Sequence, residues 1–183
     1  MMAENKANVI AGAPVATGYA FIALKTAPKP SDAKTALDEK FKGLGYISEK
    51  GLVCKYKDSK KQIKDWNKKT IAMLQEDTSA TFHVVFDEFL NMEVLKATLD
   101  PGATANKIAV GDGTVEGRTY VFNMLTAGKK MRIVIPDGVI AAHDDINFEK
   151  TELVTNGVDI ECLADENGKY FYIYVDEDTQ VAA

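Results

Sequence analysis

Hydrophobic and polar residues alternate along most of the chain with a period of two, which is typical of β-strands with one buried face. The clearest run is residues 78–87, where Ala80, Phe82, Val84 and Phe86 share one face. The residues between them share the opposite face, so this run predicts a strand with one side against a core. Similar runs predict strands at residues 15–24, 118–125, 130–135, 140–149, 153–163 and 170–175.

Turn signals separate these predicted strands. They lie at Gly111-Asp112-Gly113, Ala127-Gly128, Pro136-Asp137-Gly138, Asn156-Gly157 and Asn167-Gly168. Short strands at this spacing favour antiparallel pairing. We therefore predict a mainly β fold: an antiparallel β-sandwich or partial barrel with one or two short flanking helices.

Two segments carry helical patterns. Ser31 or Asp32 can cap a first helix whose apolar stripe extends to Phe41, and Gly43 would end it. A second helix is predicted at residues 88–99, just before Asp100-Pro101-Gly102. We expect both helices to cover an end or one face of the sheets.

The chain is long enough for one domain, which we place at residues 13–176. Residues 1–12 are expected to form a flexible arm and residues 177–183 a flexible tail, and residues 52–70 are predicted to be a basic hairpin or loop.

The uncharged run at 7–24 is interrupted by Gly12, Pro14 and Gly18. It is too broken for a secretory signal and too polar to span a bilayer, so we expect no membrane partner.

Composition excludes several classes of protein. With 46% hydrophobic and 27% charged residues, the 183-residue chain has ordinary globular composition. A net charge of −5 is unusual for a dedicated DNA or RNA binder, which presents a basic face to phosphates. Two His and two Cys argue against a metal cage or a disulfide framework. We expect Cys54 and Cys162 to be reduced and partly buried.

Charge is distributed unevenly along the chain. Residues 25–70 contain thirteen lysines and six acids, whereas residues 137–183 contain twelve acids and two lysines. One interpretation is a surface kept soluble by lysine. The other is head-to-tail association, in which a basic element of one subunit meets an acidic surface of the next.

A search for catalytic motifs gives no active site. Gly111 and Gly113 lack the Gly-Lys-Ser/Thr ending of a phosphate loop, and no Ser lies in a nucleophile elbow. His143 has only His83 as a possible histidine partner for a metal. Trp66 lies among lysines and could stack on a base or anchor a protein interface. We therefore expect no enzymatic activity, no cofactor and no bound metal.

The order of segments resembles the major tail tube proteins of long-tailed, siphophage-type bacteriophages. The resemblance covers nearly the whole chain and is carried by short motifs rather than a catalytic signature. They read NVIAGAPVATG at residues 8–18, FKGLGYISEKGL at 41–52, IKDWN at 63–67, LQEDTSATF at 74–82 and RIVIPDG at 132–138.

The resemblance implies a structural virion protein. Such subunits form rings, usually hexameric, that stack into a hollow tail tube through which the genome reaches the host. The implied partners are further copies of the chain, the tape measure, tail-tip and tail-terminator proteins, and DNA in passage without sequence-specific binding. Assembly would take place in the host cytoplasm. Two alternatives stay open: the inner tube of a contractile tail or tailocin, and a monomeric β-sandwich binding module of the tail tip, for which Tyr170, Tyr172 and Tyr174 could form an aromatic platform.

Two sets of residues are candidates for the assembled tube. The basic segment is expected to reach an adjacent ring and meet acids of the C-terminal part, through Lys55, Lys57, Lys60, Lys61, Lys64, Trp66, Lys68 and Lys69. Acidic and small polar groups would keep DNA from adhering to the lumen, because lysine and arginine attract phosphates. The lumen candidates are Ser79, Thr81, Asp87, Asp145, Asn147 and Glu149, for each of which an outer solvent-exposed face is the alternative.

Overall fold

The computed structural model describes residues 12–14, 19–111, 116–126 and 129–177. Residues 1–11 of the predicted N-terminal arm, residues 15–18 of the predicted first strand and residues 178–183 of the predicted tail lie outside the described residues. So do residues 112–115 and 127–128, where two of the turns are predicted. The elements in chain order are β1 (Ala13–Pro14), β2 (Ala20–Leu24), β3 (Lys42–Gly43), β4 (Ile47–Lys64), β5 (Thr70–Phe86), α1 (Met92–Thr98), β6 (Arg118–Thr126), β7 (Lys129–His143), β8 (Asn156–Cys162) and β9 (Tyr172–Glu177).

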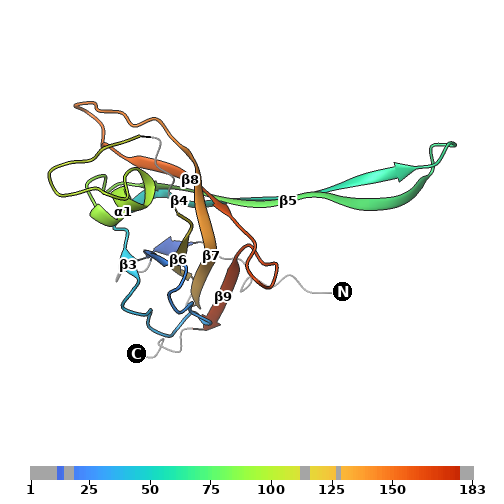
Figure 1. Cartoon of the computed structure of the whole chain (residues 1–183). Coiled ribbons are helices and arrows are strands. Elements are labelled where there is room, and N and C mark those ends of the chain that lie inside the picture. The colour runs from blue at the N-terminus through green and yellow to red at the C-terminus, as the bar shows by residue number, and fades with distance from the viewer. Residues whose placement is uncertain (1–11, 15–18, 112–115, 127–128, 178–183) are drawn as a thin grey trace.

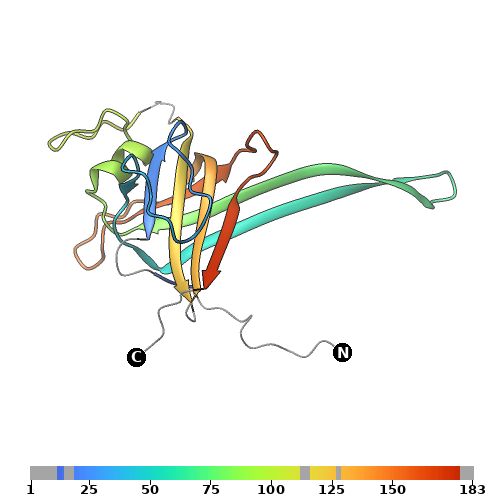
Figure 2. The ribbon, with the colours of Figure 1, turned by 90° about the horizontal axis from the view of Figure 1, so that it is seen from below.

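The described strands form one antiparallel sheet with the order β3-β2-β6-β7-β8-β5-β4, to which β1 adds beside β6 and β9 beside β7. Strand β7 is central to it: its first half pairs with β9 and its second half with β8, while β6 pairs along its other edge. The sheet bends around β7, and the long hairpin of β4 and β5 projects from one side (Figures 1 and 2). No pairing joins β3 to β4 within the described ranges, so the bent sheet is not closed into a barrel. This confirms the predicted mainly β, antiparallel fold.

The main core lies between the two halves of the bent sheet. Phe82 and Val84 of β5 and Ile160 of β8 face Tyr120 and Phe122 of β6 across it. The alternation predicted for residues 78–87 is confirmed, because the four apolar residues of that face are all buried. A smaller cluster forms on the opposite face of β2, β6 and β7, and comprises Ala23, Ala27, Phe41, Val121 and Val134.

The turn predicted at residues 136–138 is wrong, because these residues lie inside β7. They mark the place where β7 leaves β9 and begins to pair with β8. The strands approach closely here: a Cβ on Gly138 would lie 2.7 Å from Ile160 Cγ2 and 2.9 Å from Tyr120 Cδ2. The absence of a side chain at Gly138 therefore allows the strands to approach closely within β7. The bulge between Arg118 and Tyr120 of β6 lies opposite this glycine.

Two further predictions near β8 need correction. Asn156 and Gly157 do not form a turn but begin β8, where the fully buried Asn156 donates a 2.7 Å hydrogen bond from Nδ2 to Thr98 Oγ1. The strand predicted at residues 140–149 ends at His143, and residues 144–155 are an extended connection. The premise that Asp145, Asn147 and Glu149 share a strand face is therefore wrong.

The first predicted helix is also wrong, since residues 32–41 form bends and one turn. Asp32 does cap this segment: its Oδ1 accepts hydrogen bonds from the amides of Lys34 and Thr35. The side chain of Arg132 then binds the carbonyl oxygens of Asp32 and Thr35, both at 2.9 Å. A helix would need those carbonyls for its own i→i+4 bonds, so the buried guanidinium favours turns instead.

The second predicted helix exists but is shorter. It begins at Met92 rather than residue 88, because the side chain of Asn91 acts as its N-cap and accepts a 3.0 Å hydrogen bond from the amide of Glu93. Val94 and Leu95 are its most deeply buried residues. It covers one end of the sheet, on the side away from the β4–β5 hairpin (Figure 1).

Candidate assembly surfaces

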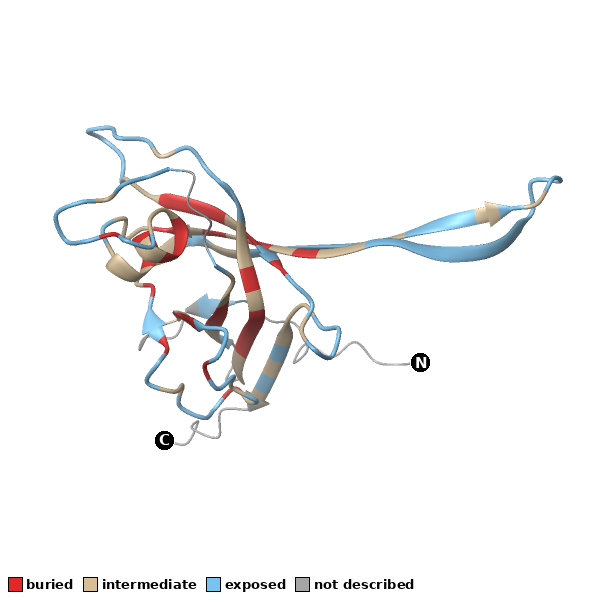
Figure 3. Cartoon of the chain, in the orientation of Figure 1, coloured by how far each residue is buried: buried red, intermediate tan, exposed pale blue. Residues whose placement is uncertain are grey.

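The outer part of the β4–β5 hairpin, residues 57–79, extends alone into solvent and is called the arm here (Figures 1 and 3). None of residues 60–77 is buried. From Lys57 to Trp66 the arm spans about 30 Å at the rise of an extended strand. The basic segment predicted at 52–70 is thus the outgoing strand and turn of a longer hairpin, whose returning strand is β5.

The tip of the arm is a well-bonded turn. The amide of Asp65 donates to the carbonyl oxygen of Lys69 at 2.8 Å, and the Asp65 side chain accepts from the Lys69 amide at the same distance. Lys68 has a φ of 65°, in the left-handed region. Trp66 is 99% exposed on this turn. A large aromatic side chain is therefore presented to solvent at the far end of the arm.

The candidate lysines lie on both faces of the ribbon, since neighbours such as Lys60 and Lys61 point in opposite directions. Lys57 pairs with Asp77 at 2.7 Å, and Lys60 lies 3.9 Å from Asp58. Over the part of the chain that the structure describes, no carboxylate forms an ion pair with Lys55, Lys61, Lys64, Lys68 or Lys69. Exposed apolar side chains lie among them: Tyr56, Ile71, Met73 and Leu74.

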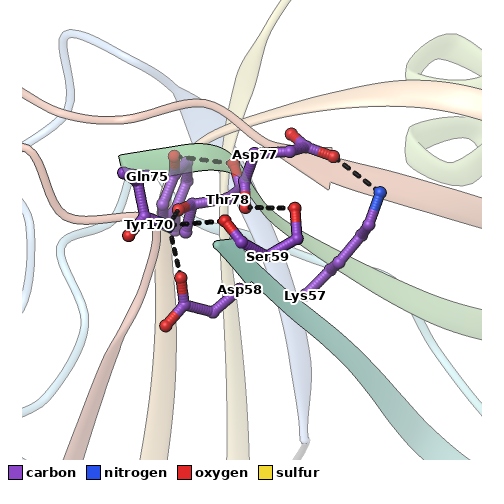
Figure 4. A network of polar contacts seen from close by, with 7 residues as sticks. All are labelled: Lys57, Asp58, Ser59, Gln75, Asp77, Thr78 and Tyr170. Atoms are coloured by element: carbon purple, nitrogen blue, oxygen red, sulfur yellow. Dashed lines mark hydrogen bonds and ion pairs between the residues drawn. The ribbon is translucent and has the colours of Figure 1, made fainter. Parts of the chain in front are cut away.

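The base of the arm is fixed by polar contacts (Figure 4). Gln75 Nε2 donates to Thr78 Oγ1 at 2.7 Å and also contacts Asp58, next to the irregular register between Ser59 and Lys60. Tyr170, from the connection between β8 and β9, donates from its hydroxyl to the carbonyl oxygen of Thr78 at 2.9 Å. The neighbouring Phe171 packs edge-on against Phe82 of the core. The direction of the arm is thus coupled to the body of the fold.

The six lumen candidates do not form one surface. Ser79 and Thr81 lie on the outer face of β5, where Lys57 is opposite Ser79, and Lys55 and Glu161 flank Thr81. Asp87 follows β5 and is half-buried, and its burial raises the pKa of that carboxyl. Asp145, Asn147 and Glu149 are exposed in the 144–155 connection. Lysines assigned to the inter-ring contact therefore share a face with two of the lumen candidates.

The sequence does not reveal a polar cluster on this same outer face. His83 Nδ1 lies 2.8 Å from Asp159 Oδ1 of β8, and His83 Nε2 lies 3.5 Å from Asp144 Oδ2. The alternation does place His83 on the outer face, but pairing of β5 with β8 is a long-range contact without a local signal. The two carboxylates make the centre of this face acidic.

Searches for other chemistry among the described residues give a negative result. No group of three or more His, Cys, Asp or Glu residues in them could hold a metal, and no described helix is long and apolar enough to cross a membrane. Cys54 and Cys162 are both free; Cys54 is exposed and Cys162 is buried, and burial raises the pKa of Cys162 to about 12.

The tyrosines considered as a platform are half-buried. Tyr172 and Tyr174 stack on each other against the smaller core cluster, and the Tyr172 hydroxyl donates to Asp165 at 2.5 Å.

Comparison with known proteins supplies the family. No curated protein matches the sequence. Among solved structures, the cap that terminates the tube of the anti-feeding prophage is similar, with a TM-score of 0.40 and 11% identity over 93% of this chain and 98% of that chain; a likeness this remote carries no argument about function. A family of phage tail tube proteins matches residues 2–183. The chain therefore belongs to the phage tail tube protein family.

Proposed function

We propose that this chain polymerises into hexameric rings, and that the rings stack into the hollow tail tube through which the phage genome passes into the host. The observation that carries the proposal, beyond family membership, is the arm. It is a long two-stranded ribbon with exposed apolar and basic side chains, and none of its residues 60–77 is buried by the described part of its own chain.

The physical argument concerns the stability of such a ribbon. A two-stranded hairpin alone in water is marginally stable, and its apolar groups gain free energy only when another surface covers them. Trp66 and Met73 are 99% and 58% exposed, so the described part of their own subunit does not cover them. An adjacent ring would provide that surface, and the unpaired lysines would set the register of the contact.

Ring closure is supported by the open edges of the sheet. Among the described strands, β9 pairs with β7 alone, and its Ile173 and Val175 are exposed. Edge strands of this kind promote uncontrolled association unless they are paired or covered. Lateral pairing of edges in a closed ring would remove this liability in every subunit.

The outer face of β4, β5 and β8 is our candidate for the lumen. Here Ser79 and Thr81 lie among balanced charges, because Asp77 pairs with Lys57, and Glu161 lies across Thr81 from Lys55. Of the two lysines on this face, Lys57 is neutralised by an ion pair and Lys55 has an acidic residue across Thr81, so DNA should be held less tightly here than on a purely basic face. The remaining lumen candidates lie outside this face: Asp87 follows β5, and Asp145, Asn147 and Glu149 lie in the 144–155 connection.

This function is structural and non-enzymatic. The proposed partners are further copies of the chain, the tape measure, tail-tip and terminator proteins, with assembly in the host cytoplasm and DNA only in passage. The inner tube of a contractile tail would use the same surfaces plus a sheath. A monomeric binding module would need an accessible aromatic platform. Tyr172 and Tyr174 do not favour this alternative, because they are packed against the smaller core cluster.

An arm-truncated variant tests the proposal. Ser59 and Asp77 are directly opposite each other, so Asn-Gly can replace residues 60–76 as a two-residue turn. Sedimentation velocity should show polymers for the full chain and a folded, non-stacking species for the variant. Equal polymerisation of both proteins would contradict a role of the arm in the tube.

A further inference from the structure

We propose that the end of the molecule opposite the arm is the docking surface for the arm of a second copy of this chain. We call this surface the receptor end and define it by Phe89, Leu90, Phe148, Glu149 and Glu152. The inference rests on the proposed function and adds which residues of the next subunit hold the arm.

The receptor end has an apolar centre. Phe148, from the 144–155 connection, packs edge-on against Phe89 with ring centroids 5.9 Å apart, yet it is still 76% exposed. Leu90, next to Phe89, is exposed to the same extent. Two segments distant in sequence therefore converge to present apolar side chains that their own subunit does not cover. Contiguous exposed apolar groups with a polar rim are typical of interaction sites.

The two segments that form this centre are acidic. Residues 87–100 and 144–155 together contain eight carboxylates and two lysines. Some carboxylates are engaged locally: Glu88 Oε1 accepts from the amide of Tyr46, and Asp144 lies beside His83. In contrast, Asp145, Glu149 and Glu152 are exposed, and no ion pair involving them occurs in the described residues. These carboxylates are available to a cationic partner.

The arm has the complementary composition. Residues 60–69, at its outer end, contain five lysines and one aspartate, with Trp66 at the turn. An apolar, basic tip thus matches an apolar, acidic receptor in both polarity and charge. Complementary charge of this kind selects the partner and its orientation, and an aromatic anchor in an apolar site supplies the affinity.

The two surfaces cannot meet within one subunit. The arm projects from one side of the body, whereas α1 and the 144–155 connection lie on the other, in both views (Figures 1 and 2). Contact between unlike surfaces at opposite ends is head-to-tail, and its repetition along an axis builds a filament. This arrangement also reassigns Asp145, Asn147 and Glu149 from the lumen to the contact between rings.

Charge exchange tests the pairing. We would make an arm variant with K61E and K64E, a receptor variant with E149K and E152K, and the combination of all four substitutions. Each pair alone should raise the critical concentration for tube formation about tenfold, and the combination should restore it toward the starting value, because opposite charges again face each other. A matched control carries E39K and E166K, two exposed carboxylates outside both the receptor end and the proposed lumen face, and should change the critical concentration little.

Disulfide trapping provides a second readout. In a Cys54→Ser background, Asn67→Cys at the tip and Asn147→Cys at the receptor end should form intermolecular disulfides in assembled tubes, whereas Asn67→Cys with Lys40→Cys should not. The receptor assignment would be overturned if the unaltered chain forms tubes but the fourfold variant shows no rescue and the crosslink does not form; the tube proposal would still stand. Crosslinks that form only with an added tail-tip protein would also overturn the receptor assignment. Failure of the unaltered chain to form tubes under any condition would overturn the proposed function itself.

Discussion

The hydroxyl of Tyr170 donates a 2.9 Å hydrogen bond to the carbonyl oxygen of Thr78, and so connects the β8–β9 loop to the base of the arm. This contact, drawn in Figure 4, lies next to Ala80, the first buried residue of β5 after the arm. It indicates that the arm does not swing freely but leaves the body in a defined direction, which docking on another subunit requires.

Replacement of Tyr170 with Phe should therefore affect both stability and assembly. Loss of the hydrogen bond should lower the free energy of unfolding by about 1 kcal/mol, a decrease in Tm of about 2–4 °C for a chain of this size. Tube formation should need a higher protein concentration, as measured by light scattering. Tyr56→Phe on the exposed ribbon is the control and should change Tm little; an equal decrease in both variants would contradict this role of Tyr170.

Replacement of the exposed Trp66 should affect assembly but not folding. Because its side chain is 99% exposed and outside the core, Trp66→Ala should leave Tm unchanged within about 1 °C. The critical concentration for tube formation should nevertheless rise, since the variant loses the proposed anchor. Circular dichroism melting and light scattering measure the two effects, and normal assembly of Trp66→Ala would argue against the anchor.

The close crossing at Gly138 predicts a large effect of a small change. Gly138→Ala places a methyl group against Ile160 and Tyr120 and should lower the free energy of unfolding by about 1–3 kcal/mol through overpacking. Gly43→Ala, whose Cβ would have no neighbour within 4 Å, is the matched control. Urea unfolding of the two variants compares them directly; equal midpoints would be inconsistent with the tight crossing.

The two thiols should differ in reactivity. Cys54 should react much faster than Cys162 with a thiol reagent at about pH 8: burial raises the pKa of both thiols, but it raises that of Cys162 to about 12 and also hides its sulfur. Both should react in denaturant. The same shift affects stability only in alkali: above about pH 9 the unfolded chain releases this proton while the folded chain keeps it, so unfolding becomes more favourable as pH rises. A Cys54→Ser chain that reacts quickly in its native state would contradict the burial of Cys162.

The sequence predicts the fold where local pattern and tertiary structure agree. The alternation around Phe82 directly reflects the buried face of β5. Local signals fail where distant residues override them. Arg132 takes the carbonyls that a helix after Asp32 would use, and Gly138 serves a strand crossing rather than a turn.

The assembly surfaces are only partly visible in the sequence for the same reason. The lysine content of the basic segment identifies the arm, but not the returning strand or its length. The contact of Phe89 with Phe148 joins segments almost sixty residues apart and has no local signature. The receptor end could therefore be found only from the three-dimensional arrangement.

The most direct test of the central claim is negative-stain electron microscopy of the purified full chain, concentrated, at low and at high salt and with added tail-tip extract as a seed. We expect hollow tubes of uniform diameter that shorten at high salt, because screening weakens the charged contact between rings. Dispersed monomers under all of these conditions would contradict the assignment of this chain as the subunit of a tail tube.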